Sequence, residues 1–285
     1  MSVDKFIKYV FPTIPVRVAD TKDCILNAIL YKDNYAPGED GIEEGYKLNI
    51  ALCIENCSSH PMDYYPHYQK YGNYGDPRIH VYFYNHINRC IFNEKYIAIP
   101  LLYPQLDYLR RFYAEIKPTT IIPFYKKKLC LFASWGGYRS HVKQQIIRFM
   151  KSLGPGACDT LEVHKPSVGA ASCYHSAELL NVIQQYKFVF VCENSLGDGY
   201  ITEKIFNGFF GRAIPIYNGS PAIERYFNKD SFINANDPAN LARIPVIMNN
   251  EVAFQRMIDA EKIGPYDNED YAHKLRQFME TKLQS

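Results

Sequence analysis

Residues 187–221, KFVFVCENSLGDGYITEKIFNGFFGRAIPIYNGSP, decide the fold of this chain. The apolar run over 187–193 predicts a buried strand that ends in polar residues and a turn containing Gly197 and Gly199. A helical pattern follows from about Thr202 to Phe210, and residues 213–218 predict a second strand. A buried strand, a glycine-containing turn and a helix in this order indicate a ligand-binding turn of a parallel α/β fold.

The same alternation extends over the second half of the chain. Residues 126–134 and 160–164 predict strands, and residues 140–152 and 176–186 predict helices. From about 238 to 284 there are three amphipathic patterns without a strand, so we expect a helical C-terminal tail. Short apolar runs between helical segments are typical of β–α units around a parallel sheet.

The first half predicts a second set of strands. A helical pattern over 106–117 ends before Pro118, and PTTIIP (118–123) is interpreted as the crossing between domains. We therefore predict the α/β class, with Rossmann-like domains at residues 1–120 and 121–285 and parallel sheets facing a cleft, where ligands of such sheets bind. The strands predicted in the first domain are residues 15–20, 48–54, 78–84 and 97–103.

Composition restricts the function classes. The formal net charge is +2, and the 32 basic and 30 acidic residues are mixed along the chain, which argues against a nucleic-acid binder with a broad basic surface. No segment reaches the roughly 18 to 20 apolar residues that span a bilayer. Glycosylation sequons begin at Asn56 and Asn218, where a glycan would obstruct the predicted site. We therefore expect a cytoplasmic protein that is neither anchored nor secreted.

Metal binding is not indicated by the sequence. Of the eight cysteines, only Cys53 and Cys57 are close together, and no second Cys/His pair follows at ligand spacing, so buried free thiols are favoured over zinc. The Asp198 segment lacks the paired carboxylates that would hold a divalent ion on a diphosphate.

The start of the helix near Thr202 is a candidate phosphate site. Thr202 or Ser195 can cap the helix, and the exposed N–H groups and helix dipole favour an anion there. Lys204 lies in the first turn, where the dipole disfavours a cation. Its presence is explained either by a bound anion or by simple solvation at the surface.

The segment 192–221 resembles the donor-site motif of glycosyltransferase family 10, which generally reads F-E-N-S, a short spacer, Y-[IV]-T-E-K and A-[IV]-P-[IV]-x-x-G. Cys192 stands where the family usually has Phe, at a packing position. The resemblance implies that four residues contact the nucleotide sugar. These are Asn194 and Tyr200 about the base and ribose, Glu203 on ribose or sugar hydroxyls, and Lys204 on the diphosphate.

Upstream, LFASWGGYRSHVKQQIIRFM (131–150) resembles the family segment in which a strand ends in F-x-A/S-N before a loop and an Arg that opens a helix. This implies that Arg139 lies beside the diphosphate, a role for which the forked donors of guanidinium are suited. Trp135 replaces the usual Asn, so the match is looser here. The alternative interpretation of Arg139 is a surface residue at a helix start.

An inverting transfer also requires a general base in the acceptor domain. The strand over 48–54 leads into Glu55-Asn56, which resembles the family's strand ending G-E-N, with Ile54 in place of the Gly. YIAIPLLYP (96–104) resembles the family's Y-x-x-x-P-x-x-Y element. Glu55 is our candidate base. The competing candidates are Glu39, Asp40, Glu43, Glu44, Asp63 and His60, the last of which could also assist Glu55.

The family resemblance implies a GT-B fold and an inverting glycosyltransferase that moves L-fucose from GDP-fucose to a glycan hydroxyl in an α-1,3-type linkage. It also implies direct displacement with no obligatory metal or other cofactor. Two alternatives remain: the same architecture with another donor, such as UDP-xylose or a GDP-hexose, and a non-catalytic protein that binds sugar nucleotides or glycans. The sequence indicates neither the acceptor nor the oligomeric state.

Overall fold

The structure, a computed structural model, forms two units by backbone contacts. Unit 1 comprises Met1–Leu106, Leu196–Tyr200 and Asp267–Ser285, and unit 2 comprises Asp107–Ser195 and Ile201–Tyr266. The predicted limits at residues 120 and 121, and the binding role given to each domain, stay predictions. The residues that the structure describes are 16–17, 26–31, 48–53, 81–84, 96–98, 114–134, 141–162, 176–193, 200–202 and 204–264, with positions 277, 280, 281 and 284.

Unit 1 contains a five-stranded parallel sheet in the order β1-β2-β3-β4-β5. The four predicted strands are confirmed as β1 (Val16–Arg17), β3 (Leu48–Cys53), β4 (Val81–Tyr84) and β5 (Tyr96–Ala98). The strand β2 (Leu26–Tyr31) was not predicted; its run LNAILY carries a polar Asn in its second position. Pairing with β1 and β3 on both sides compensates for this weak local signal.

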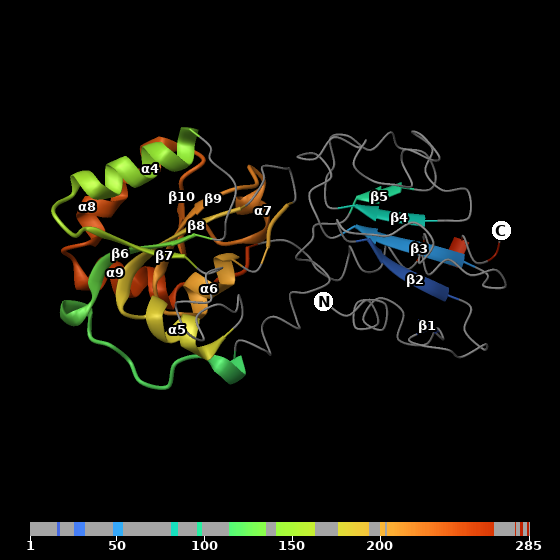
Figure 1. The fold of residues 1–285 in the computed structure, drawn as a ribbon, viewed down its shortest axis with the longest axis horizontal. Helices are drawn as coiled ribbons and strands as arrows, with labels where there is room; N and C mark the ends of the chain where they lie inside the picture. The colour runs from blue at the N-terminus through green and yellow to red at the C-terminus, as the bar shows by residue number, and fades with distance from the viewer. Residues whose placement is uncertain are drawn as a thin grey trace. The chain divides into compact units, whose positions relative to one another are not determined.

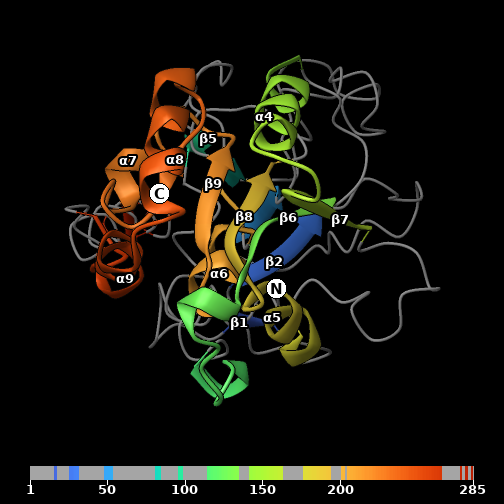
Figure 2. The same cartoon turned by 90° about the vertical axis from the view of Figure 1, so that its left-hand side faces the viewer.

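Unit 2 contains a second parallel sheet, in the order β10-β9-β8-β6-β7 (Figures 1 and 2). The strands and helices predicted between residues 126 and 218 are confirmed, and β10 is an additional strand. Of the helix predicted over 106–117, residues 114–116 are helical and residues 106–113 lie outside the described residues. The strands of this sheet and the helices between them are β6 (Lys128–Ser134), α4 (His141–Ser152), β7 (Cys158–Glu162), α5 (Ala177–Ile183), β8 (Tyr186–Cys192), α6 (Lys204–Phe210), β9 (Ile214–Asn218), α7 (Ile223–Tyr226) and β10 (Ile233–Asn234).

The described residues after position 238 are mainly helical, as predicted. They form the 3₁₀ segment η6 (Pro238–Ala242), then α8 (Arg243–Ile247) and α9 (Glu251–Asp259). Asn250 caps α9 by accepting a hydrogen bond from the Ala253 N–H at 3.0 Å, the usual role of Asn at a helix start. A single antiparallel bridge joins Phe227 to Ile263.

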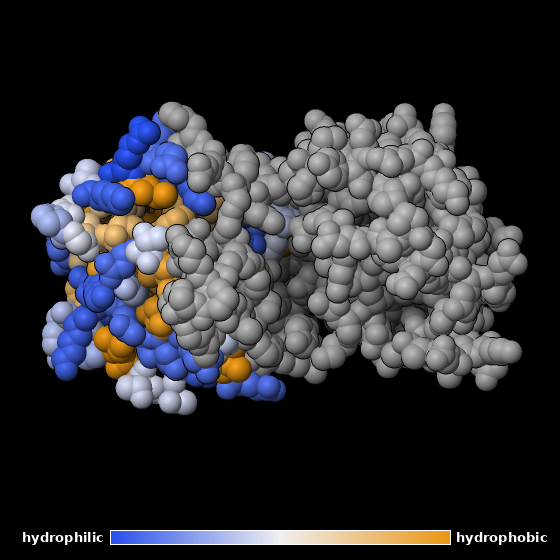
Figure 3. All heavy atoms as spheres, viewed as in Figure 1, coloured by the Kyte–Doolittle hydropathy of each residue, from blue (hydrophilic) through white to orange (hydrophobic). Residues whose placement is uncertain are grey.

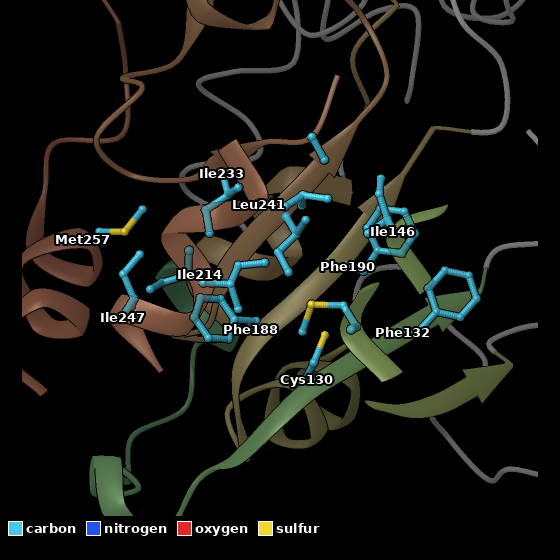
Figure 4. Packing of buried hydrophobic residues seen from close by; sticks show 14 of the residues in the cluster. Cys130, Phe132, Ile146, Phe188, Phe190, Ile214, Ile233, Leu241, Ile247 and Met257 are labelled. Atoms are coloured by element: carbon cyan, nitrogen blue, oxygen red, sulfur yellow. The ribbon is translucent and has the colours of Figure 1, made fainter. Parts of the chain in front are cut away.

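Helices cover both faces of the unit 2 sheet (Figure 1). Alternate residues of the strands, such as Phe188 and Phe190, form an apolar cluster with residues of α4, α8 and α9 (Figure 4). On the opposite face α6 lies close to the sheet, because a Cβ on Gly208 would come within 2.7 Å of Pro215 and 3.0 Å of Val189. A glycine at position 208 therefore permits the close approach of helix and sheet.

The outer surface of unit 2 is mixed in polarity. In Figure 3 hydrophilic residues surround small groups of apolar ones on the face in view. The large apolar side chains exposed in the described part of the chain are Ile121, Tyr125, Val246 and Val252. Within those same residues, no helix has the length and apolar character needed to cross a membrane.

Candidate functional site

The carboxyl ends of β8 and β9 form the centre of the candidate site. Glu193 follows β8 directly, and its N–H donates to the carbonyl of Asn218, the last residue of β9, at 2.9 Å. Ligands of open parallel sheets bind at this edge. The backbone pairing therefore places the Glu193 side chain where a ligand of this fold would bind.

The Glu193 carboxylate is fully buried and accepts several hydrogen bonds. Oε1 accepts from the Thr202 N–H at 2.8 Å and from the Tyr217 hydroxyl at 3.4 Å. Oε2 accepts from the Thr202 hydroxyl at 2.7 Å and lies 3.3 Å from Nζ of Lys204, which is also buried. A buried charge requires such partners, so these donors stabilise the ionised carboxylate.

Glu193 accounts for the position of Lys204. A lysine in the first turn of α6 opposes the helix dipole. From the sequence, its presence there is explained either by a bound anion or by solvation at the surface. The structure shows that Lys204 is buried and pairs with Glu193, while its Nζ also donates to the Thr202 hydroxyl at 2.8 Å. The chain thus supplies an anion of its own. Binding of Lys204 to a diphosphate stays a prediction.

Tyr217 connects Glu193 to the segment after β9. Its hydroxyl donates to Glu193 and accepts from the Ser220 N–H at 3.1 Å. Burial, followed by the charge of Glu193, raises the pKa of Tyr217 well above its usual value. The phenol therefore remains protonated and acts as the donor in this pair.

Gly219 is required by the close packing of this network. A Cβ at this position would lie 2.4 Å from the Tyr217 hydroxyl oxygen and 2.5 Å from Cγ of Glu193. No side chain fits there without displacing Tyr217 or Glu193.

Asn236 fixes the same segment from the other side. Its Oδ1 accepts from Nδ2 of Asn218 and from the Gly219 N–H, both at 3.0 Å, and its Nδ2 donates to the Ser220 carbonyl at 3.1 Å. Asn218 is 2% exposed. The fold therefore shields the Asn218 sequon, because its amide is buried and hydrogen-bonded.

A second buried lysine approaches this edge from the opposite face of the sheet. Lys143, in the first turn of α4, is 8% exposed, and its Nζ lies 5.0 Å from the centre of the Phe132 ring in β6. Burial raises the pKa of Cys192 to about 12, and the charges of Lys143 and Lys204 act in the opposite direction. Both cations therefore lie near the end of β8.

Glu193 and Lys143 are functional candidates to which no role was assigned from the sequence. A signal for Lys143 was present, because it precedes the buried Ile146 and Met150 at the i, i+3, i+7 spacing of a buried helix face. Glu193 offered no such signal, since its contacts depend on the path of the chain between β8 and α6.

Of the residues predicted to bind the donor, the structure describes two. Tyr200 and Lys204 are both buried. The other predicted site residues, Glu55, Arg139, Asn194 and Glu203, lie outside the described residues. All the competing candidates for the base lie outside them as well. In the part of the chain that is described, no three His, Cys, Asp or Glu side chains are grouped so as to hold a metal ion.

Residues 134–257 match the family model described as glycosyltransferase family 10 (fucosyltransferase), C-terminal part. This region is a glycosyltransferase family 10 domain. It includes β7 to β10 and the whole network around Glu193. The family assignment made from the motif over 192–221 is therefore confirmed.

The chain is also similar in sequence to individual fucosyltransferases. The chain is 26% identical over 230 residues to the α-(1,3)-fucosyltransferase FucT of Helicobacter pylori, covering 68% of this chain and 48% of the relative. It is 31% identical over 108 residues to α-(1,3)-fucosyltransferase B of Drosophila melanogaster, covering 35% and 24%. The chain thus spans about half or less of the length of these relatives.

Solved structures show the same fold. A crystal structure of an α1,3-fucosyltransferase superimposes with a TM-score of 0.64 at 17% identity, covering 98% of this chain and 84% of the other. A second, with GDP, gives a TM-score of 0.61 at 17% identity, covering 100% and 98%. These likenesses confirm the predicted α/β fold of the GT-B type.

Proposed function

We propose that this protein is an inverting fucosyltransferase that transfers L-fucose from GDP-fucose to a glycan hydroxyl in an α-1,3-type linkage. The observation that carries the proposal is the family 10 domain over residues 134–257, whose donor motif contains the buried Lys204–Glu193 pair at the carboxyl edge of a parallel sheet. A solved α1,3-fucosyltransferase with GDP-fucose, 18% identical, has a similar fold with a TM-score of 0.57.

In this proposal the second domain, residues 121–285, binds the donor. Lys204 contacts the diphosphate, and its ammonium is held in place by Glu193 and Thr202 before a ligand binds. A cation fixed in this way stabilises the charge that develops on the leaving diphosphate without having to reorganise. The other donor contacts are assigned to Arg139, Asn194, Tyr200 and Glu203.

The residues of the first domain are proposed to act on the acceptor. Glu55 removes the proton of the acceptor hydroxyl while that oxygen attacks the anomeric carbon, and GDP leaves from the opposite face. This direct displacement inverts the anomeric configuration and needs no metal in the proposed scheme. Residues 1–120 are accordingly the proposed acceptor domain, and residues 121–285 the proposed donor domain.

Thermal unfolding with a panel of nucleotides tests the donor. GDP and GDP-fucose should raise the melting temperature, because a ligand that binds only the native state stabilises it by mass action. UDP, UDP-xylose and UDP-glucose at equal concentration should have little effect. If UDP but not GDP raises the melting temperature, the donor is a UDP-sugar and the proposal of GDP-fucose is wrong.

The base assignment needs a separate test. Glu55→Gln should abolish fucose transfer, measured by chromatography of a labelled acceptor, while the Kd for GDP-fucose stays within a few-fold of wild type. Transfer at a near-normal rate would rule out Glu55 as the base. If GDP-fucose binds but is never transferred by the wild-type protein, a non-catalytic binding role is correct instead.

A further inference from the structure

Two free thiols occupy matching positions in neighbouring strands of unit 2. Cys130 of β6 and Cys158, the first residue of β7, are Cα partners in the parallel pairing. Paired strands lie about 4.8 Å apart, within the range of roughly 4.4 to 6.8 Å between Cα atoms joined by a disulfide. Both side chains pack against the same apolar cluster, so they lie on one face of the sheet.

The two thiols differ in access. Cys130 is buried, whereas Cys158 is half-buried and begins the strand at the edge of the sheet. A reagent from solution therefore reaches Cys158 first. Cys130 lies behind it, at the distance of the neighbouring strand.

The pKa values of the two thiols also differ, and the more exposed thiol, Cys158, has the lower one. The hydrogen bond from the Cys130 thiol, and then the charge of Lys151 in α4, lower the pKa of Cys158 against the effect of partial burial. Burial raises the pKa of Cys130 well above its usual value. Since the thiolate is the reactive form, Cys158 is suited to attack and Cys130 to react second.

The turn before β7 has room to adjust. Gly154 and Gly156 have φ angles of 144° and 70°, in the region that favours glycine, and a Cβ at either position would meet no atom within 4 Å. The turn that precedes Cys158 therefore has open space on the side where a side chain at either glycine would point. In the described residues no third metal-binding side chain joins the two thiols, which favours a dithiol over a metal site.

We propose that Cys130 and Cys158 form a reversible disulfide by exchange with small disulfides of the glutathione type. The Cys158 thiolate attacks one sulfur of the small disulfide, which yields a mixed disulfide and one small thiolate. Cys130 then loses its proton, and its sulfur attacks Sγ of Cys158 and releases the second small thiol. Two protein thiols and one small disulfide give one protein disulfide and two small thiols.

Oxidised glutathione, followed by alkylation, non-reducing digestion and mass spectrometry, tests the proposal on the native protein. A linked pair of peptides containing Cys130 and Cys158 should form and should disappear after dithiothreitol. Cys192 serves as an internal control, since burial raises its pKa to about 12 and it should be alkylated only after denaturation.

Two variants separate the steps. In Cys130→Ala the reaction should end at a glutathione adduct on Cys158, and in Cys158→Ala the thiol of Cys130 should stay unmodified. Circular dichroism should show that both variants are folded. A wild-type protein that stops at the adduct on Cys158, or that leaves both thiols reduced under conditions that oxidise a model dithiol, would overturn the proposal. The inference does not depend on the proposed transferase activity.

Discussion

Replacing Glu193 by Gln should destabilise unit 2 strongly, although the two side chains have nearly the same shape. Both carboxylate oxygens accept hydrogen bonds, so an amide in either orientation places an NH₂ donor against Thr202, Tyr217 or Lys204. The change also removes the negative charge beside the ammonium of Lys204. Because no volume is lost, a cavity does not contribute to the effect.

Burial sets the magnitude of the loss. The side chains of Lys204 and Glu193 are 6% and 0% exposed, and removing one partner of such a buried pair costs about 3–5 kcal/mol. The pair Lys128–Asp159 is the matched control. It is shorter, at 2.9 Å against 3.3 Å, and its carboxylate also accepts from a tyrosine hydroxyl, but its side chains are 59% and 41% exposed. Asp159→Asn should therefore cost less than about 1 kcal/mol.

Urea denaturation followed by tryptophan fluorescence measures both losses, because the single Trp of the chain, Trp135, belongs to unit 2. With an m-value of about 2 kcal/mol/M, Glu193→Gln should lower the unfolding midpoint by roughly 1.5–2.5 M. Asp159→Asn should lower it by less than about 0.5 M. Equal shifts in the two variants would refute the reasoning, because burial would then not determine the strength of the pair.

Three further predictions concern this unit. Gly219→Ala should lower the unfolding free energy by about 1–3 kcal/mol in the same assay, since its Cβ would lie 2.4 Å from the Tyr217 hydroxyl oxygen; an unchanged midpoint would contradict the close packing. Lys204→Ala should weaken GDP binding in calorimetry, and an affinity equal to that of wild type would exclude the diphosphate contact. Burial, then the charge of Arg212, lowers the pKa of Lys127 to about 8. The unfolded chain therefore binds more protons than the folded one between about pH 8 and 10.4, so the stability contributed by Lys127 rises with pH there. The difference in unfolding free energy between wild type and Lys127→Met should increase from pH 8 to pH 10, and a constant difference would contradict the shift.

The sequence predicted most of the fold because its strands and helices have strong local patterns. β8 is a continuous apolar run and α4 has clear helical spacing, so both were found with nearly correct limits. β10 has two residues and exists through its pairing with β9, and β2 contains a polar Asn inside a short run. Elements of this kind depend on their neighbours in space more than on their own sequence.

The candidate site was predicted less completely, for a related reason. The motif predicts donor contacts for Lys204 and Tyr200, which stay predictions, and the burial of these two residues could not be derived from it. Glu193 was interpreted only as a polar residue that ends a strand. Its contact with Lys204 arises because the chain returns from the turn to the same sheet edge, which a pattern of residue types does not record.

The Lys204–Glu193 pair joins the stability of the fold to the proposed chemistry. An ion pair buried to this degree is weak evidence for stability alone, because packed apolar residues often serve as well. It does fix an ammonium in one position, so the entropy of ordering a long side chain is lost during folding and not when a ligand binds. Glu193 must also reduce the attraction of Lys204 for a diphosphate. The arrangement therefore favours a cation of defined position over one of maximal affinity, as is expected of a site that stabilises a transition state more than a bound substrate.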